Sequence, residues 1–235
     1  MTAPKLFDLV DGKTRKVSFS PMVWRAKFAL NHKKVAYETI PVTFLDIPVL
    51  IPKTCPNITS PTVPTMQISG NEGIQDSLAI AEYLEKTYPD GPSIFGREKS
   101  EKNLQKFFDS YVSSKLHPVI QRLVYIEMYE AQDDDNAAYF KSSREKSGGN
   151  TLENLGGDPN QNIKELKEHL GLIHKALGSG EFITGEQPGW ADFTLLAAFI
   201  WFNSFSPQKF EEGVLNAFGD QVLRNYWQKA QALIH

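Results

Sequence analysis

The stretch that decides the fold is residues 63–84, VPTMQISGNEGIQDSLAIAEYL in one-letter code. It holds two short runs typical of strands, 65–68 and 74–75, and the turn between them is rich in glycine, which predicts a hairpin. Asp76 and Ser77 follow, and both residue types cap helices well. Apolar residues then recur at helical spacing as far as Tyr88, which predicts a helix with one buried face. That face consists of Ile80, Ala81, Leu84 and Tyr88.

Upstream of the hairpin, the pattern predicts a strand, a helix and a second strand. Residues 5–10 and 37–42 alternate apolar and polar side chains, and residues 21–30 carry apolar side chains at helical spacing. A strand–helix–strand unit gives a parallel pair, to which the hairpin adds antiparallel strands. Pro41 cannot donate to a sheet ladder, so the second strand is expected at the edge. Residues 46–62 are predicted to be irregular.

Downstream, the chain changes character at a cluster of helix breakers, residues 88–92 (YPDGP). The pattern predicts two domains, 1–88 with mixed structure and 99–235 with helices alone, joined by a linker over 89–98. Helical spacing runs from Leu104 to Leu116, and Pro118 predicts a kink.

Two further helices are predicted in this second part. Asp158 and Pro159 are typical of a helix start, and Gly178 is typical of the end of that helix. Residues 190–202 are apolar nearly all round, which predicts the central buried helix of the second domain.

Composition excludes several classes of function. The 235 residues contain 25 Lys plus Arg and 28 Asp plus Glu, a net charge of −3, so the basic excess that favours nucleic acid is missing. The single cysteine, Cys55, excludes an internal disulfide and fits a reducing, cytoplasmic location. The longest apolar run, 193–202, is about half of what spans a bilayer, and Lys5, Asp8 and Asp11 do not fit a signal peptide. We expect no membrane and no nucleic-acid partner.

Motifs for metals and common cofactors are missing from the sequence. The five histidines show no ligand spacing, and no phosphate-binding loop, dinucleotide glycine pattern or nucleophile elbow occurs. We therefore expect no metal site and a reactive group that is supplied by a ligand.

Ser20 is the first residue that could carry chemistry. It stands in the N-cap position before Pro21, so the simplest interpretation is a helix cap. A hydroxyl can also donate, and an anion held over a helix N-terminus would accept from it. A thiolate suits that place, because helix N-termini lower the pKa of thiols.

Val63–Pro64 and Asp76–Ser77 can likewise have a purely structural role or a role in ligand binding. Pro64 is tolerated at a strand entry, but a cis Val63–Pro64 bond would turn the backbone of Val63 towards a peptide ligand. Asp76 and Ser77 can simply cap the helix. They can also receive an ammonium and a carboxylate, the α-amino-acid end of a ligand.

Together these features resemble the thioredoxin-like domain of cytosolic glutathione transferases, and residues 189–193 (GWADF) resemble the helix-capping motif of the second domain in those proteins. The resemblance covers nearly the whole chain. Residues 19–30, 46–62 and 139–153 are most similar to the fungal etherase-like (FuA) class, which is related to the bacterial β-etherases. The implied fold is an N-terminal thioredoxin-like α/β domain followed by an all-helical C-terminal domain.

The resemblance implies roles for particular residues. Ser20 would donate to the sulfur of glutathione, with Ser18 as a second candidate. The backbone of Val63, with Pro64 cis, would pair with the cysteinyl part, and Asp76 and Ser77 would hold the γ-glutamyl end. Lys53 would meet the glycine carboxylate. An apolar substrate would contact residues from both domains: Phe19, Met22, Tyr111 and Leu116.

The implied activity is that of a detoxifying transferase that attacks apolar aromatic electrophiles or aryl ethers, in a protein that forms a homodimer. One alternative is a ligandin that binds aromatic or phenolic compounds and glutathione conjugates with little turnover. A purely structural or regulatory relative is a third possibility, against which Ser20, Asp76 and Ser77 count.

Overall fold

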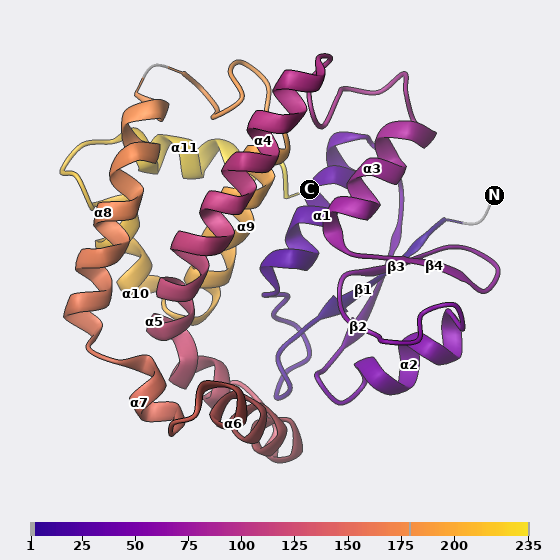
Figure 1. The fold of residues 1–235 in the computed structure, drawn as a ribbon, viewed down its shortest axis with the longest axis horizontal. Coiled ribbons are helices and arrows are strands. Elements are labelled where there is room, and N and C mark those ends of the chain that lie inside the picture. The colour runs from indigo at the N-terminus through magenta and orange to yellow at the C-terminus, as the bar shows by residue number, and fades with distance from the viewer. Residues whose placement is uncertain (1–2, 179, 235) are drawn as a thin grey trace. The chain divides into compact units, whose positions relative to one another are not determined.

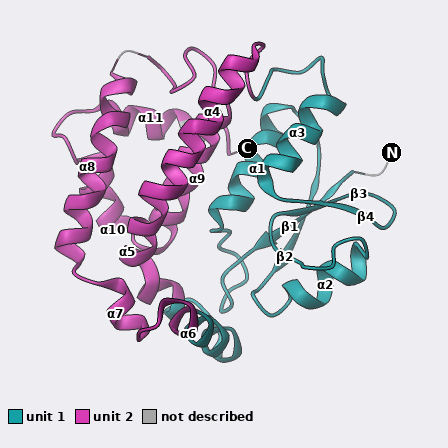
Figure 2. Cartoon of the chain, in the orientation of Figure 1, with its two compact units in different colours: residues 1–94, 129–143 teal, residues 95–128, 144–235 magenta. Residues whose placement is uncertain are grey.

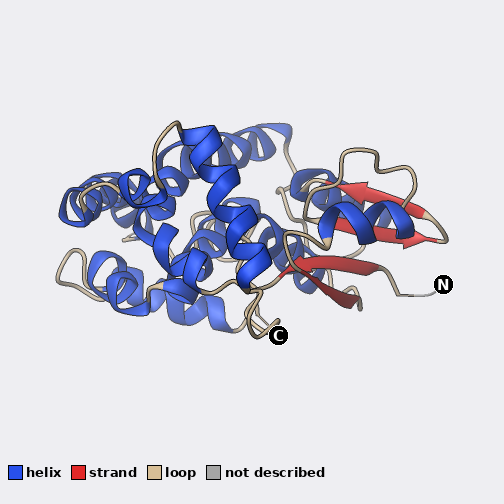
Figure 3. Ribbon diagram, turned by 90° about the horizontal axis from the view of Figure 1, so that it is seen from below, coloured by secondary structure: helices blue, strands red, loops and turns tan. Residues whose placement is uncertain are grey.

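The computed structural model describes residues 3–178 and 180–234, and the chain divides into two compact units (Figures 1 and 2). Unit 1 comprises residues 1–94 and 129–143, and unit 2 comprises residues 95–128 and 144–235. Every strand of the described chain belongs to unit 1, whereas unit 2 is built from helices (Figure 3). The predicted fold class, a mixed α/β part followed by an all-helical part, is confirmed.

Unit 1 contains a four-stranded sheet. Its strands are β1 (Lys5–Leu9), β2 (Glu38–Val42), β3 (Thr65–Ser69) and β4 (Glu72–Gln75), in the order β2-β1-β3-β4. β1 pairs parallel with β2 and antiparallel with β3, and β3 pairs antiparallel with β4. The parallel pair, the hairpin and the edge position of the strand that contains Pro41 are confirmed.

Helices lie on both faces of this sheet. They are α1 (Pro21–His32), α2 (Ile47–Thr54) and α3 (Ser77–Thr87). Phe7 of β1 packs in an apolar cluster with Ile51 of α2, while the next residue, Asp8, binds Lys27 of α1. Because successive side chains of a strand point to opposite faces, α2 covers one face and α1 the other. α3 packs against α1.

The helix α2 was not predicted: the expectation of irregular structure over residues 46–62 was wrong for Ile47–Thr54, whereas residues 55–62 are irregular. Pro48 sits at the start of the helix, where its missing N–H costs nothing, but Pro52 lies inside it. The buried side chain of Ile51, packed against Phe7, provides apolar contact that offsets this break. Tertiary packing therefore overrides local propensity here.

The second half of the chain is helical and belongs to unit 2, except that most of α6 lies in unit 1 (Figure 2). The helices after α3 are α4 (Lys99–Tyr111), α5 (His117–Glu130), α6 (Asp134–Gly148), α7 (Leu152–Gly156), α8 (Pro159–Leu177), α9 (Trp190–Phe205), α10 (Pro207–Phe210) and α11 (Val222–Gln231). The predicted start and end of α8, at Asp158 and Gly178, are confirmed. The predicted central helix is also confirmed, because every residue of α9 from Trp190 to Phe202 is buried.

The helical path does not stop at Pro118. A π-helical turn, Val112–Leu116, joins α4 to α5, and the N–H of His117 donates to the carbonyl of Val112. A widened turn before a proline relieves the clash of its ring with the preceding turn and accommodates its missing donor. Where a kink was predicted, the helix thus continues through Pro118 after a π-helical turn.

Three apolar side chains are more exposed than helical spacing alone suggests. Tyr88 was predicted to be buried, but it follows the last turn of α3 and is 38% exposed. On α4, Leu104 and Phe107 are 67% and 72% exposed, whereas Val112 and Leu116 further along the chain are fully buried. No helix of the described chain has the length and apolar character needed to span a membrane.

Candidate functional site

The structure brings Val63–Pro64 and Asp76–Ser77 together at one end of the sheet. The Val63–Pro64 bond is cis, as the resemblance implies. The N–H of Asp76 donates to the carbonyl of Pro64 at 3.1 Å, which ties the end of β4 to the start of β3. Among the described residues, the backbone N–H and C=O of Val63 have no hydrogen-bond partner. Val63 can therefore pair with an added peptide strand.

The start of α1 lies at the same end of the sheet. Phe7 stands opposite Thr65, so the last residue of β1, Leu9, points past the beginning of β3. The N–H of Phe19 donates to the carbonyl of Leu9 at 3.4 Å, which places Ser20 directly beyond this end. The sheet register thus gathers Ser20, Val63 and Asp76 from three separate parts of the sequence.

The hydroxyl of Ser20 has an unused donor. Ser20 is 6% exposed, and its Oγ accepts from the N–H of Val23 at 3.4 Å, a long cap bond. Its hydroxyl hydrogen has no acceptor anywhere in the described chain. Pro21 at the first helical position keeps the helix start regular. An anion placed at this helix N-terminus would receive a hydrogen bond from Ser20.

Unlike that of Ser20, the hydroxyl of Ser18 donates to a partner within the protein. Its Oγ donates to Oδ1 of Asp8 at 2.8 Å and accepts from Nζ of Lys27 at 2.9 Å. Lys27 also forms an ion pair with Oδ2 of Asp8 at 2.6 Å, with both side chains almost completely buried. Burial, and then the nearby charge of Asp8, raises the pKa of Tyr37 to about 12, so this phenol stays neutral. The donor of Ser18 is therefore occupied inside the protein.

Asp76 has a strained backbone and one free carboxylate oxygen. Its φ of +86° lies in a region that side-chain-bearing residues rarely adopt. Oδ1 accepts from the N–H groups of Leu78 and Ala79, which makes Asp76 the cap of α3. Oδ2 has no partner in the described chain. Strain of this kind is concentrated at functional sites, and the free oxygen can accept from an ammonium group.

Ser77, the residue after Asp76, adds a hydroxyl group at the start of α3. It is 3% exposed, and its hydroxyl has no hydrogen-bond partner among the residues that the structure describes. It stands in the first turn of α3, where the helix dipole favours an anion such as a carboxylate. Asp76 and Ser77 thus offer an acceptor for a cation beside a donor for an anion.

Lys53 and Cys55 stand apart from this cluster. Lys53 is exposed in the last turn of α2, and no hydrogen bond or ion pair of the described chain ties it to the other candidates. Cys55 is fully buried in the apolar cluster with Phe7, and burial raises the pKa of its thiol. A neutral, buried thiol is a poor nucleophile, so Cys55 is a structural residue.

The four candidates for substrate contact differ in accessibility. Phe19 and Met22 belong to unit 1; Phe19 is 1% exposed, and Met22 is half-buried. Tyr111 and Leu116 belong to unit 2, where Leu116 is fully buried. Tyr111 is half-buried, and its hydroxyl donates to the carbonyl of His169 at 2.7 Å. Met22 and Tyr111 therefore have surface that a ligand can reach.

Two features near Ser20 were missed by sequence reasoning. The first is the ion pair of Asp8 and Lys27, which are nineteen residues apart and give no local signal in the sequence. The second is a row of aromatic rings in unit 1. The ring of Phe44 lies 6.2 Å from that of Phe19 and 6.2 Å from that of Tyr139, which is 47% exposed. These contacts span about a hundred residues of sequence, so no local pattern reveals them.

Two models of one protein family match the chain. A family model described as the N-terminal domain of glutathione S-transferase matches residues 16–93, and one described as the C-terminal domain matches residues 103–232. The glutathione S-transferase-like protein ustS of Aspergillus flavus is 25% identical and covers 94% of this chain and 86% of its own length.

Solved structures of fungal proteins share the fold. Glutathione transferase GSTFuA3 from Phanerochaete chrysosporium is 24% identical, with a TM-score of 0.85 over 99% of this chain and 98% of that one. The glutathione S-transferase CsGST63524 of Ceriporiopsis subvermispora, solved in complex with glutathione, is 24% identical, with a TM-score of 0.80 over 99% and 96% of the two chains. The two matched domains span the predicted glutathione residues and most of the chain. The chain belongs to the glutathione S-transferase family.

Proposed function

We propose that the protein is a serine-type glutathione transferase, in which the hydroxyl of Ser20 donates a hydrogen bond to the glutathione thiolate. The observation that carries this proposal is the unused donor of Ser20 at the start of α1. The competing hydroxyl, that of Ser18, already donates to Asp8. A charge-assisted hydrogen bond stabilises the thiolate over the thiol and so lowers the pKa of the thiol.

The rest of glutathione would be held by the cluster around Ser20. The backbone of Val63 pairs with the cysteinyl residue, because its N–H and C=O have no partner among the residues that the structure describes. Asp76 accepts from the γ-glutamyl ammonium, and Ser77 donates to the neighbouring carboxylate. Lys53 provides a cation for the glycine carboxylate from the end of α2. No metal takes part in this scheme.

The substrates proposed are apolar aromatic electrophiles, including aryl ethers, which fits a role in detoxification in the cytoplasm. Tyr139 is exposed and lies against the half-buried ring of Phe44 in the same unit as Ser20, which supports this choice. With an aryl ether, the sulfur forms a C–S bond as the C–O bond breaks. The phenolate leaves with the bonding electrons, and the proton lost by the thiol ends on the phenol.

The test is a pH titration of bound glutathione, followed by thiolate absorbance, in wild type, Ser20→Ala and Ser18→Ala. We expect Ser20→Ala to raise the thiol pKa by about one to two units, because a hydrogen bond to a charged group contributes roughly 1.5–3 kcal/mol. Ser18→Ala should leave the titration where it is. If Ser20→Ala lowers only the stability, by about 1 kcal/mol, Ser20 is a cap and the serine-type proposal is wrong.

Turnover separates this proposal from the ligandin alternative. Wild-type protein is assayed with a generic aromatic electrophile, and displacement of a fluorescent dye is measured in parallel. Conjugate formation that falls in Ser20→Ala supports the transferase. Tight dye binding without conjugate formation would replace the transferase by a ligandin.

A further inference from the structure

We propose that Tyr139 of α6 determines the specificity of the transferase by contacting the aryl group of the electrophile. This inference rests on the proposed function, because it names a residue beside which the substrate would lie while it reacts at Ser20. The family resemblance assigned the substrate contacts of the helical half to Tyr111 and Leu116. Tyr139 comes instead from a segment of the second half that belongs to unit 1.

Phe19 and Phe44 lie beyond the same edge of the sheet. Leu9 and Val42 are the last residues of β1 and β2 and stand opposite each other in a parallel pair. The N–H of Phe19 donates to the carbonyl of Leu9, and Phe44 follows β2 by two residues. The carboxyl ends of neighbouring parallel strands share one edge, where α/β sheets commonly bind their ligands. Phe44 therefore stands at the edge from which α1 begins.

The first part of α6 is tied to the loops at this edge. The N–H of Leu45 donates to Oδ1 of Asn136 at 3.1 Å. Nδ2 of Asn136 donates to Oδ2 of Asp133 at 2.9 Å, so both polar groups of this buried amide are used. Just before α6, Oε1 of Gln132 accepts from the N–H of Gly12 at 3.1 Å. These bonds join the segment to the loops that follow β1 and β2, and they hold it within unit 1.

Tyr139 and Phe140 follow Asn136 by three and four residues, which places them on the face of α6 that meets Phe44. The ring of Phe140 is fully buried and lies 5.6 Å from that of Phe44. The ring of Tyr139 lies 6.2 Å from the same ring but is 47% exposed. Phe140 therefore supplies the buried contact of the helix, whereas Tyr139 leaves much of its ring accessible to a ligand.

The accessible ring of Tyr139 suits the aryl group of an electrophile. Two ring contacts, from Tyr139 to Phe44 and from Phe44 to Phe19, connect it to the residue before Ser20. An aryl group joined to the reacting carbon by a short linker can cover such a span while the thiolate stays at Ser20. Aromatic rings whose centroids are about 4.5–7 Å apart attract each other beyond the effect of the area they bury. Tyr139 therefore favours aryl over alkyl electrophiles that react by the same chemistry.

The experiment compares phenethyl and ethyl isothiocyanate, which differ only by a phenyl ring. In both, the glutathione sulfur bonds to the central carbon, the C=N π electrons move to nitrogen, and nitrogen takes the proton that the thiol loses. We expect Tyr139→Ala to lower kcat/KM for the phenethyl compound about three- to ten-fold and to leave kcat/KM for the ethyl compound unchanged. Tyr139→Phe keeps the ring and should keep the wild-type values for both.

Two measurements accompany each variant, the melting temperature and the thiol titration of bound glutathione. Both should stay at their wild-type values, because Tyr139 is exposed and acts on the aryl group, not on the sulfur. If alanine destabilises α6, Tyr139→Leu, which keeps apolar contact with Phe44, takes its place in the comparison. An equal loss of kcat/KM for both isothiocyanates, or no loss for either, would overturn the proposal.

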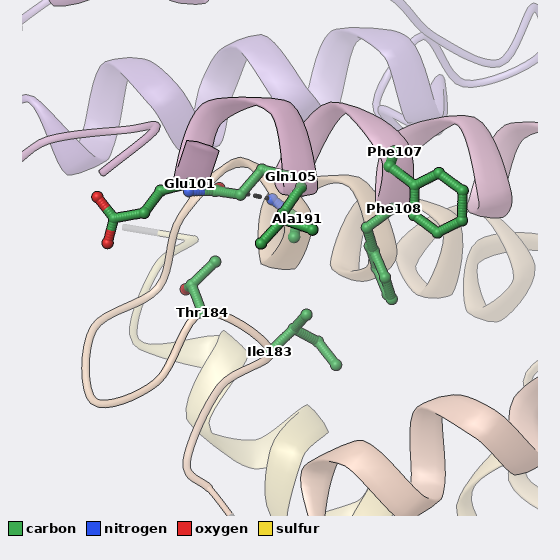
Figure 4. A pocket seen from close by; sticks show the side chains of 8 residues that line it. Glu101, Gln105, Phe107, Phe108, Ile183, Thr184 and Ala191 are labelled. Carbon is green, nitrogen blue, oxygen red and sulfur yellow. Dashed lines mark hydrogen bonds between the residues drawn. The ribbon is translucent and has the colours of Figure 1, made fainter. Parts of the chain in front are cut away.

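Two exposed aromatic residues serve as matched controls. Tyr88, 38% exposed, belongs to unit 1 but follows the last turn of α3, the end of that helix away from Asp76. Phe107, 72% exposed, belongs to unit 2, where its ring lies beside a pocket of about 320 Å³ (Figure 4). Tyr88→Ala and Phe107→Ala should both keep the preference for the phenethyl compound. If Phe107→Ala abolishes the preference and Tyr139→Ala keeps it, the aryl group lies in unit 2 and the proposal is wrong.

Equilibrium binding separates a failure of this inference from a failure of the proposed function. S-phenethylglutathione and S-ethylglutathione bind without reacting, and titration calorimetry measures the affinity of each. We expect Tyr139→Ala to lose affinity about three- to ten-fold for the phenethyl ligand alone. If wild type conjugates neither isothiocyanate but Tyr139→Ala shows this selective loss, the transferase proposal fails and the contact of Tyr139 with the aryl group stands. If wild type conjugates both and Tyr139→Ala binds both ligands as wild type does, only the role of Tyr139 is wrong.

Discussion

Nζ of Lys27 lies 2.6 Å from Oδ2 of Asp8, and this ion pair is buried between α1 and β1, directly behind the start of the helix that carries Ser20. Ser18 completes the network as a hydrogen-bond partner of both residues. The network attaches the segment before α1 to the sheet.

Removing one partner of this pair should be costly. We expect Lys27→Met to lower the free energy of unfolding by about 3–5 kcal/mol, because Asp8 would remain buried without a counter-charge. Urea denaturation measures the loss. Lys5→Met is the matched control, since the Lys5–Glu38 pair is exposed and should contribute less than about 1 kcal/mol. If both variants lose the same free energy of unfolding, burial of the Asp8–Lys27 pair does not determine its contribution to stability.

Asp76→Asn should weaken glutathione binding and leave the fold intact. Asparagine caps a helix as well as aspartate does, but it removes the negative charge that faces the γ-glutamyl ammonium. We expect the dissociation constant to rise about ten-fold, measured by titration calorimetry. With N-acetylglutathione, which lacks the ammonium, wild type and variant should bind alike. A ten-fold loss of affinity for both ligands would show that Asp76 does not act by binding the γ-glutamyl ammonium.

Acid should destabilise unit 1 through a buried lysine–glutamate pair. Nζ of Lys33 lies 2.7 Å from Oε2 of Glu85, and the lysine side chain is only 1% exposed. Burial tends to raise the pKa of Glu85, but hydrogen bonds from Lys33, Ser93 and Ile94, together with the lysine charge, outweigh it and hold that pKa below its usual value.

A carboxyl group with a lowered pKa in the folded state stabilises the fold above its unfolded pKa, about 4.3, and this contribution is lost as the pH falls through the folded value. Melting temperatures should therefore be steady between about pH 7 and pH 5 and then fall. Glu85→Gln should have a lower melting temperature than wild type at pH 7, and its melting temperature should fall less steeply below pH 5. A melting temperature that rises below pH 4 would contradict this assignment.

Homodimer formation is also predicted, with the first domain of one subunit paired with the second domain of the other. Light scattering should give about 53 kDa, twice the mass of the 26.5 kDa chain. A species of 26.5 kDa at micromolar concentration would contradict the prediction.

Local sequence determined the elements whose signals lie within a few residues of one another. The cap at Ser20 with Pro21, the cap at Asp158 with Pro159 and the apolar run of α9 each depend on short-range hydrogen bonds or on helical spacing, and the structure confirms them. The same holds for the hairpin, because its turn residues and alternating side chains are adjacent in the chain. The residues assigned to glutathione came from this local pattern together with the family resemblance.

Only the tertiary structure decided what depends on distant partners. α2 forms in spite of Pro52 because Ile51 is buried against Phe7, forty-four residues away. Residues 129–143 join unit 1 because Asn136 and Phe140 bind and pack against Leu45 and Phe44. Ser18 is occupied because the packing of α1 on β1 brings Lys27 and Ser18 to Asp8, whereas the hydroxyl hydrogen of Ser20 has no acceptor among the described residues. A hydroxyl is the same in sequence wherever it stands, and only its neighbours in space decide whether its proton is still available to a ligand.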